Sequence, residues 1–195
     1  MSLRDLGKRK MDDIYIEKIL KGDHNSFQYF IKTYKRFAFS LAYAILKDKN
    51  LTEDVVQDSF IKAFNGLKSF KRNASFQTWF GKIVINESLR KANYGSREYV
   101  TYNEISNCDI EIVNDSINSL ILEEQKFFIS AVFEQLSINE SIALELFYIK
   151  ENSIEEITEI TGWSASKIKM LLLRGRKNFY ARLKKLLKSE VKEII

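Results

Sequence analysis

Apolar residues recur at helical spacing along most of the chain. Between residues 27 and 46 they follow one another in steps of three or four, with some adjacent pairs, as one buried helix face requires. The same spacing predicts further helices over residues 12–21, 53–64 and 76–91. Asn50 and Thr52 are candidate caps for the helix that begins at residue 53. The first half is therefore predicted to be a helical bundle.

The second half carries local signals for helix starts. Apolar spacing predicts a helix over residues 117–136. Ser137 with Glu140, and Ser153 with Glu156, have the spacing of capping boxes, which predicts two helices that begin there. Residues 161–163 (Thr-Gly-Trp) then predict a tight turn, and Ser164 caps a long helix that runs to about residue 188. Two helices joined by a short glycine-containing turn indicate a helix-turn-helix.

The last helix separates into an apolar and a basic face. At about 100° per residue, the apolar face holds Ile168, Leu172, Gly175, Phe179 and Leu183. The opposite face holds Ser166, Lys167, Lys169, Met170, Leu173, Arg174 and Lys177. This suits a recognition helix whose first turns enter a major groove. An amphipathic surface helix with solvated lysines fits the same pattern.

Between the two halves the periodicity disappears. The residues from about 93 to 116 are polar and aperiodic, which predicts a linker. The expected fold class is therefore all-α, with two small helical domains joined by a flexible linker. We place the first domain at residues 12–94, the acidic linker at 95–116 and the second domain at 117–190.

Composition excludes several classes of protein. Of the 195 residues, 45% are hydrophobic, too many for a disordered chain, yet there is no run of about 18 apolar residues to span a membrane. The polar, basic N-terminus lacks the features of a secretory signal. Cys108 and His24 are the only residues of their types, which argues against internal disulfides, zinc sites and histidine-dependent catalysis. We expect a cytoplasmic protein with no metal, no cofactor and no stable membrane association.

Charge is segregated along the sequence. Residues 61–100 carry 8 basic and 2 acidic side chains, residues 101–160 carry 2 and 13, and residues 161–190 carry 9 and 1. Cationic blocks of this size suit a polyanion such as DNA. The acidic middle does not suit the same phosphate backbone, which favours two separate DNA-binding parts. Solvated helix faces are the alternative reading of each basic block.

Several spaced motifs resemble one family. Residues 51–64 (LTEDVVQDSFIKAF) are similar to region 2.2 of sigma-70 factors of the extracytoplasmic-function (ECF) group, and residues 69–70, 75–80, 83 and 86 resemble the region that follows. Residues 162–169 (GWSASKIK) and 174–177 (RGRK) are similar to region 4.2. The resemblance implies a region 2 helical bundle and a region 4 helix-turn-helix. It also implies a non-enzymatic activity, which is to direct core RNA polymerase to promoters.

Region 2.2 implies a polymerase-binding surface. The residues that match it are Asp54, Val55, Gln57, Asp58, Phe60, Ile61 and Phe64, which would dock on the clamp helices of the β′ subunit. Val55, Phe60 and Phe64 fit the protein core equally well. The polar residues are better contact candidates, because burying them without partners is costly.

The next segment matches the positions that read the minus-10 element. They are Phe70, Lys71, Arg72, Asn73, Ala74, Ser75, Lys82, Asn86, Arg90 and Lys91. In the family a loop captures an unpaired base of the non-template strand, using backbone groups and a small pocket. The Asn86 amide can both donate and accept, while the cations can hold phosphate. Residues 71–73 are Lys-Arg-Asn where the family frequently has a Gly and an acidic residue, so its base preference does not carry over.

The second helix of the helix-turn-helix matches the family's helix that reads the minus-35 element. The residues are Ser164, Ser166, Lys167, Lys169, Met170, Arg174, Arg176 and Lys177. Lys and Arg can bond guanine edges or phosphates, and Met170 can contact a thymine methyl. Many relatives have Thr, Ser and Arg where this chain has Lys167, Met170 and Leu171, which breaks any inherited base code. Arg176 lies nearer the inner face.

The predicted partners are core RNA polymerase, through its β′ clamp helices and its β subunit, and promoter DNA. The sequence leaves open whether an anti-sigma factor also binds. Three alternatives remain: a helix-turn-helix regulator that binds duplex DNA without polymerase, a small Mg²⁺-dependent nuclease, and an inactive module that sequesters a partner. The nuclease lacks a phosphate-cradling glycine loop, and the regulator leaves the region 2.2 motif without a purpose.

Overall fold

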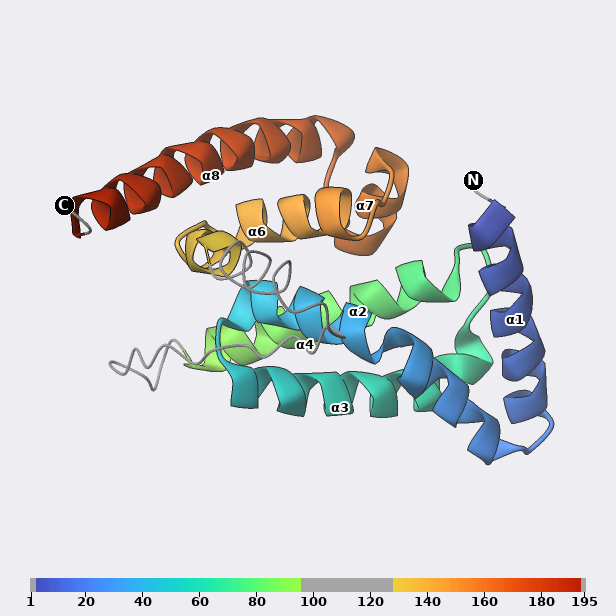
Figure 1. The fold of residues 1–195 in the computed structure, drawn as a ribbon. Helices are drawn as coiled ribbons and strands as arrows, with labels where there is room; N and C mark the ends of the chain where they lie inside the picture. Colours follow the sequence, from blue (N-terminus) through green and yellow to red (C-terminus); the bar gives the residue numbers. More distant parts are fainter. Residues whose placement is uncertain (1–2, 96–127, 194–195) are drawn as a thin grey trace, which may run out of the picture.

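The structure is a computed structural model that describes residues 3–95 and 128–193. Every regular element within these ranges is helical, which confirms the all-α fold class (Figure 1). In the first half the elements are α1 (Leu3–Leu20), a 3₁₀ turn (His24–Phe27), α2 (Gln28–Leu46), α3 (Lys49–Gly66), a 3₁₀ turn (Leu67–Ser69) and α4 (Phe76–Gly95). In the second half residues 128–134 are helical, and α6 (Ile138–Leu144), a π-helical segment (Glu145–Ile149), α7 (Ile154–Thr161) and α8 (Ala165–Glu193) follow.

The first half is a bundle of α2, α3 and α4 with α1 against one end (Figure 1). Its core contains a cluster of aromatic rings among aliphatic side chains. The Phe30 ring lies 4.2 Å from that of Phe76, and the Phe60 ring lies 4.7 Å from that of Phe80. These rings come from three helices and reach the centre because each helix places its apolar residues on one face.

Two helix starts differ from the sequence predictions. α1 begins at Leu3 and not near residue 12. α3 begins at Lys49, and its cap is Asp48, whose carboxylate accepts a hydrogen bond from the Leu51 backbone N–H at 2.7 Å. Asn50 and Thr52 lie inside the helix, and the Thr52 hydroxyl donates to the Asp48 carbonyl at 2.6 Å.

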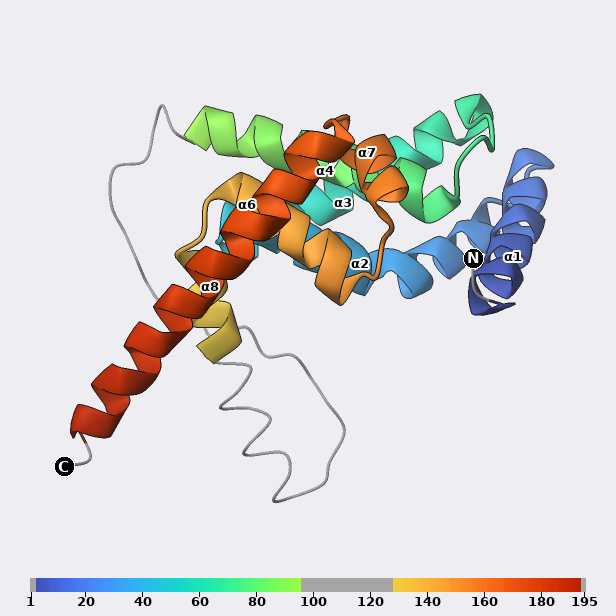
Figure 2. The same cartoon turned by 90° about the horizontal axis from the view of Figure 1, so that it is seen from above.

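The second half follows the local signals closely. Both predicted capping boxes are present, at Ser137 with Glu140 and at Ser153 with Glu156. Gly162 ends α7 with a φ of 72°, a conformation that glycine adopts without steric cost. α8 then crosses over α6 (Figure 2). At the crossing a Cβ on Gly175 would lie 3.1 Å from Leu144, so the close approach depends on glycine.

The two halves pack on each other through α6 and α7, which lie against α2 and α4 (Figure 1). Gly81 of α4 lies at this contact, where a Cβ would meet Ile160 of α7 at 3.4 Å and Phe37 of α2 at 3.2 Å. Lys47, at the end of α2, donates to the Phe133 carbonyl at 2.5 Å and to the Ser141 hydroxyl at 3.2 Å. Apart from Gly95, the predicted linker lies outside the described residues.

Candidate nucleic-acid interface

One face of α3 exposes acidic, amide and apolar groups together. Asp54, Gln57, Asp58 and Ile61 all have exposed side chains, and Ile61 is 59% exposed. They are three or four residues apart and therefore share one side of the helix. A large exposed apolar side chain beside carboxylates suits a protein partner. We call these four residues the α3 face.

The other three predicted contacts on α3 lie deeper. Val55 and Phe60 are only 2% and 7% exposed, and Phe64 is half-buried. The Phe64 ring meets the ring of Phe27 edge-on at 5.1 Å. Val55 and Phe60 are thus core residues in the free chain, the alternative that their apolar character left open, and they support the α3 face from beneath.

The loop between α3 and α4 is anchored by aromatic rings. Phe70 is half-buried, and its ring lies 4.8 Å from that of Trp79. Beyond it Lys71 and Asn73 are exposed, while Arg72, Ala74 and Ser75 are half-buried. Ser75 caps α4, because its hydroxyl accepts a hydrogen bond from the Thr78 N–H at 3.1 Å. We call residues 71–75 the recognition loop.

α4 continues this surface with polar and cationic groups. Lys82, Asn86 and Arg90 are exposed and four residues apart, so they line one side of the helix. Lys91 is half-buried. The recognition loop thus lies directly before α4, and Lys82, Asn86 and Arg90 lie along one side of that helix.

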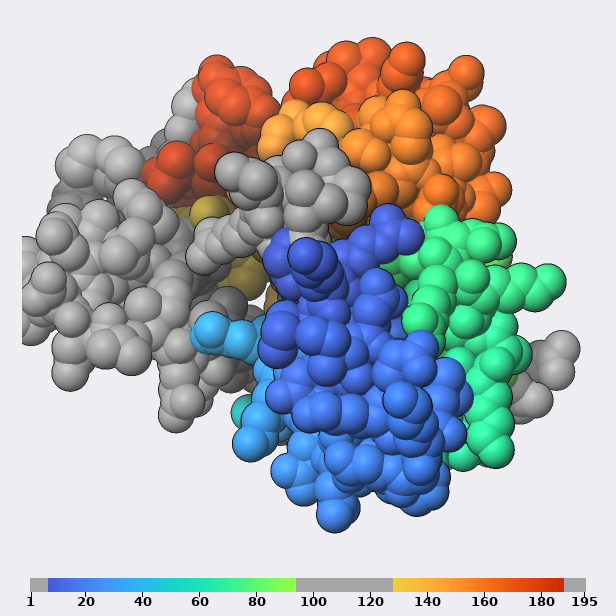
Figure 3. All heavy atoms as spheres, turned by 90° about the vertical axis from the view of Figure 1, so that its right-hand side faces the viewer, coloured from blue at the N-terminus to red at the C-terminus, as the bar shows by residue number. Residues whose placement is uncertain are grey.

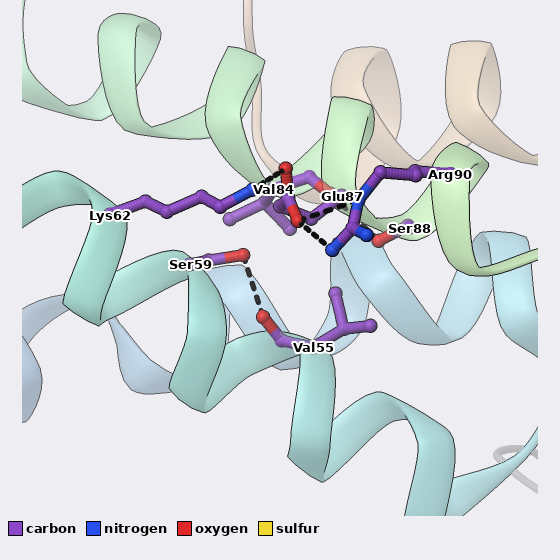
Figure 4. A network of polar contacts seen from close by, with 7 residues as sticks. All are labelled: Val55, Ser59, Lys62, Val84, Glu87, Ser88 and Arg90. Carbon is purple, nitrogen blue, oxygen red and sulfur yellow. Dashed lines mark hydrogen bonds and ion pairs between the residues drawn. The ribbon is translucent and has the colours of Figure 1, made fainter.

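A buried carboxylate organises the cations on α3 and α4 (Figure 4). Glu87 is 7% exposed and accepts hydrogen bonds from Arg90 Nε at 3.1 Å and Nη2 at 2.7 Å. Lys62 of α3 forms an ion pair with its other oxygen at 2.5 Å. Burial opposes ionisation, but the hydrogen bonds from Lys62 and Arg90 outweigh it and lower the pKa of Glu87.

Lys62 and Glu87 were not among the predicted site residues. Their pairing joins α3 to α4, and sequence spacing within one helix gives no signal for it. Nearby, the buried hydroxyls of Ser59 and Ser88 each donate to a carbonyl of their own helix, at 2.7 and 2.8 Å (Figure 4).

The N-terminal half of α8 presents the predicted basic face. Ser166, Lys169, Met170, Arg174 and Lys177 are exposed. Ser164 is exposed and caps the helix, because its hydroxyl accepts from the Lys167 N–H at 3.2 Å. Lys167 is half-buried with its ammonium 4.5 Å from the centre of the Trp163 ring. The predicted inner residues Ile168, Leu172 and Gly175 are buried, and Phe179 and Leu183 are half-buried, which confirms the two faces.

Two arginines of α8 have partners within the chain. The guanidinium of Arg174 lies 3.6 Å from the Glu140 carboxylate. Arg176 donates to the Leu172 carbonyl and to the Tyr148 hydroxyl, both at 3.2 Å. These contacts hold the two cations at the edge of the α8 basic face.

No three His, Cys, Asp or Glu side chains in residues 3–95 and 128–193 gather closely enough to hold a metal ion. None of the helices in these ranges has both the length and the apolar character that crossing a membrane requires.

Comparison with known sequences identifies relatives. The family model of sigma-70 region 2 matches residues 30–98. The ECF RNA polymerase sigma factor SigW of Bacillus subtilis is 26% identical over 179 residues, which cover 88% of this chain and 96% of that protein. The ECF RNA polymerase sigma-E factor of Escherichia coli is 24% identical, with 88% and 93% covered.

Solved structures share the fold. CnrH in complex with the cytosolic domain of CnrY has a TM-score of 0.61 at 17% identity, with 90% of this chain and 96% of that chain covered. The sigma factor RpoE of Bartonella quintana, in complex with the anti-sigma factor NepR, has a TM-score of 0.64 at 21% identity, with 81% and 96% covered. These similarities support the predicted all-helical fold.

Proposed function

We propose that this chain, which belongs to the extracytoplasmic-function group of sigma-70 factors, directs core RNA polymerase to promoters and starts transcription there. The observation that carries the proposal is the presence of three separate exposed surfaces in one chain. They are the α3 face, the recognition loop with its continuation on α4, and the α8 basic face. A regulator that binds duplex DNA alone needs only the last of these.

The α3 face is the proposed polymerase contact. Its exposed carboxylates and Ile61 would meet the β′ clamp helices, with the apolar side chain buried at the centre and the charges around it. Val55 and Phe60 act from the core by fixing the position of α3, and Phe64 lies at the edge. The β subunit is the second polymerase contact, which we assign to the second half of the chain.

The recognition loop and α4 are the proposed minus-10 surface. Phe70, held against Trp79, fixes where the recognition loop begins. Exposed Asn73 and Asn86 offer amides to a base that has left the stack. Lys71 and Lys82 are exposed cations that suit phosphate contact, as is Arg90, whose guanidinium also pairs with Glu87. Binding of the unpaired base would trap melted DNA, which needs no nucleotide hydrolysis by this chain.

The α8 basic face is the proposed minus-35 surface. Its N-terminal turns carry Ser166, Lys169 and Met170 outward, as major-groove readout by a helix requires. Lys177 lies further along the helix and suits phosphate contact. We assign residues 12–94 to region 2 and residues 117–190 to region 4, with the acidic linker at 95–116.

The remaining partners follow from the same proposal. Members of this family are regulators and not enzymes, and we propose no catalytic step for this chain. It would work in the cytoplasm, where core polymerase acts. The RpoE and CnrH structures each contain a second protein, so we propose that an anti-sigma factor also binds this chain.

Reconstitution tests the function. Purified chain is mixed with core RNA polymerase and fragmented genomic DNA, and transcript start sites are mapped with and without the chain. We expect new start sites that share two spaced sequence elements. Tight duplex binding by the chain alone, with no binding to polymerase and no new transcripts, would identify a free-standing regulator and overturn the proposal.

A further inference from the structure

Arg72 adopts an unusual backbone conformation in the middle of the recognition loop. Its φ is +58°, in the left-handed region that favours glycine. A residue with a Cβ holds this conformation at a steric cost, so other contacts must stabilise it. The shape of the recognition loop at Arg72 therefore depends on contacts with other parts of the chain.

Two residues of α1 hold Arg72 from both of its polar ends. The carboxylate of Glu17 lies 2.6 Å from the Arg72 guanidinium. The guanidinium of Arg9 donates to the Arg72 backbone carbonyl at 3.3 Å. Arg9 and Glu17 lie 63 and 55 residues upstream of Arg72. Both the side chain and the backbone of the recognition loop are thus tied to α1.

α1 is itself anchored to the bundle next to the recognition loop. Asp12 is 3% exposed and accepts hydrogen bonds from Tyr34 at 2.5 Å and from Tyr29 at 3.0 Å. Lys8 donates to Gln77 in the first turn of α4 at 2.9 Å. Figure 3 shows α1, in dark blue, lying against the green segment that contains the recognition loop. α1 is therefore a firm base for the recognition loop.

We propose that Glu17 and Arg9 are positioning residues that hold the recognition loop in its DNA-binding shape by clamping Arg72 onto α1. The proposal rests on the proposed function, because it assigns a role within the minus-10 surface. Arg72 then acts through the shape of the recognition loop, while Lys71 and Asn73, which are exposed on either side of it, are free to face DNA.

The proposal makes an unusual prediction for charge. Removing a carboxylate near a DNA-binding surface ordinarily strengthens binding, because repulsion of phosphate falls. If Arg72 contacted phosphate directly, Glu17→Gln would also release its guanidinium and tighten binding. If Glu17 positions the recognition loop, the same variant weakens binding to melted minus-10 DNA.

The experiment uses holoenzyme formed from the full chain and core polymerase. A pool of DNA with a randomised premelted segment is first selected with the wild-type holoenzyme. Binding to one selected DNA is then measured for Glu17→Gln, Arg72→Ala, Arg72→Gly and the exchange Glu17→Arg with Arg72→Glu. Asp13→Asn, on the same helix, is the control for loss of one negative charge. A duplex that carries only the minus-35 element is the second probe.

We expect Glu17→Gln and Arg72→Ala to weaken binding to the premelted DNA by about threefold to fivefold, the upper part of the range for one partly exposed ion pair. Arg72→Gly should weaken this binding less than Arg72→Ala does, because glycine adopts the left-handed conformation freely. The charge exchange should restore binding to the premelted DNA. Asp13→Asn should bind that DNA as tightly as wild type, and no variant should change the affinity for the minus-35 duplex.

Two results separate failure of this proposal from failure of the function. If the wild-type holoenzyme selects no DNA, the proposed function is wrong. If it selects DNA and Glu17→Gln binds as tightly as Asp13→Asn, or more tightly than wild type, the positioning role of Glu17 is wrong.

Discussion

The side-chain ammonium of Lys47, which ends α2, lies 2.5 Å from the Phe133 carbonyl oxygen and joins the two halves of the chain. Lys47 itself has a left-handed backbone, with a φ of 56°, which turns the chain away from α2. Burial lowers the pKa of Lys47 to about 8, although Glu134 and Glu145 oppose this shift. An ionisable group therefore lies at the contact between the halves.

Stability should rise between pH 8 and pH 9.5. In this range the unfolded chain keeps its proton on Lys47, because the pKa of an exposed lysine is 10.5, while the folded chain releases it. The unfolded state then binds more protons, so the free energy of unfolding increases with pH, by about 1 kcal/mol. Urea denaturation at the two pH values measures this.

Lys47→Met is the control for that rise. The variant removes the titrating group and should have a free energy of unfolding that is flat over the same range. Measurements stop at pH 9.5 because of Tyr29. Burial raises the pKa of Tyr29 to about 12 in the folded chain. Above pH 10 this tyrosine ionises in the unfolded chain first, which reduces the free energy of unfolding. If the free energy of unfolding of Lys47→Met rises equally over this range, Lys47 is not the source of the rise.

Gly81→Val should destabilise the contact between the halves. A Cβ at this position already meets Phe37 at 3.2 Å and Ile160 at 3.4 Å, and the valine methyls add further volume there. Overpacking of this kind costs about 1–3 kcal/mol of unfolding free energy. Thermal and urea denaturation measure it, with Gly7→Val as the control because a Cβ on Gly7 meets nothing within 4 Å. Equal stability of the two variants would contradict the prediction.

Local signals explain which parts of the fold could be predicted. A serine three residues before a glutamate satisfies two backbone donors within one turn, so the starts of α6 and α7 are encoded in four residues each. The predicted start of α3 was wrong, because Asp48, which is as good a cap as Asn50 or Thr52, was not among the predicted caps. α1 begins among polar residues that have no apolar period.

Contacts between distant residues explain what was missed. Glu17 and Arg72 are 55 residues apart, and Lys47 and Phe133 are 86 apart. No periodicity within a helix relates such pairs, since their approach depends on how the helices pack. The resemblance predicts that residues 71–75 and α8 contact DNA, and this stays a prediction. Only the structure shows that Arg9 and Glu17 of α1 contact Arg72, and that Val55 and Phe60 are buried.

Glu87→Gln should destabilise the first half at neutral pH. The neutral amide loses the charge that pairs with Lys62 and Arg90, at a cost of about 1–2 kcal/mol because both cations are partly exposed. The lowered pKa of Glu87 means that its contribution is present above pH 4.5 and is lost as the pH falls below that value. Urea denaturation at pH 7 and pH 3.5 should therefore show a smaller loss of stability in Glu87→Gln than in wild type. Exposed Glu53→Gln is the control.

Asp58→Lys should weaken binding to core polymerase without unfolding the chain. Asp58 is exposed on the α3 face, so its replacement should change the free energy of unfolding by no more than about 0.5 kcal/mol. Reversing its charge at a protein interface should raise the Kd for core polymerase by at least about tenfold. Co-purification and fluorescence anisotropy measure it, with Glu159→Lys on α7 as the matched charge reversal. If both variants bind equally, the α3 face is not the polymerase contact.

Lys169→Ala should reveal whether the α8 basic face reads bases or phosphates. Lys169 is exposed in the first turns of α8, and its removal leaves the buried face of that helix intact. A phosphate contact predicts uniformly weaker binding across DNA sequences. It also predicts that the slope of log affinity against log salt concentration becomes shallower by about one. A base contact predicts relaxed preference at one position of the minus-35 element, worth about 1–3 kcal/mol.

Holoenzyme binding to the selected promoter, and to single-base variants of its minus-35 element, is measured at several salt concentrations. We expect the base contact, because Lys169 lies beside exposed Ser166 and Met170 in the turn that we propose enters the major groove. Lys185→Ala, near the other end of α8, is the matched control and should leave base preference unchanged. Equal behaviour of the two lysine variants, with an unchanged salt slope, would show that this turn of α8 does not meet DNA.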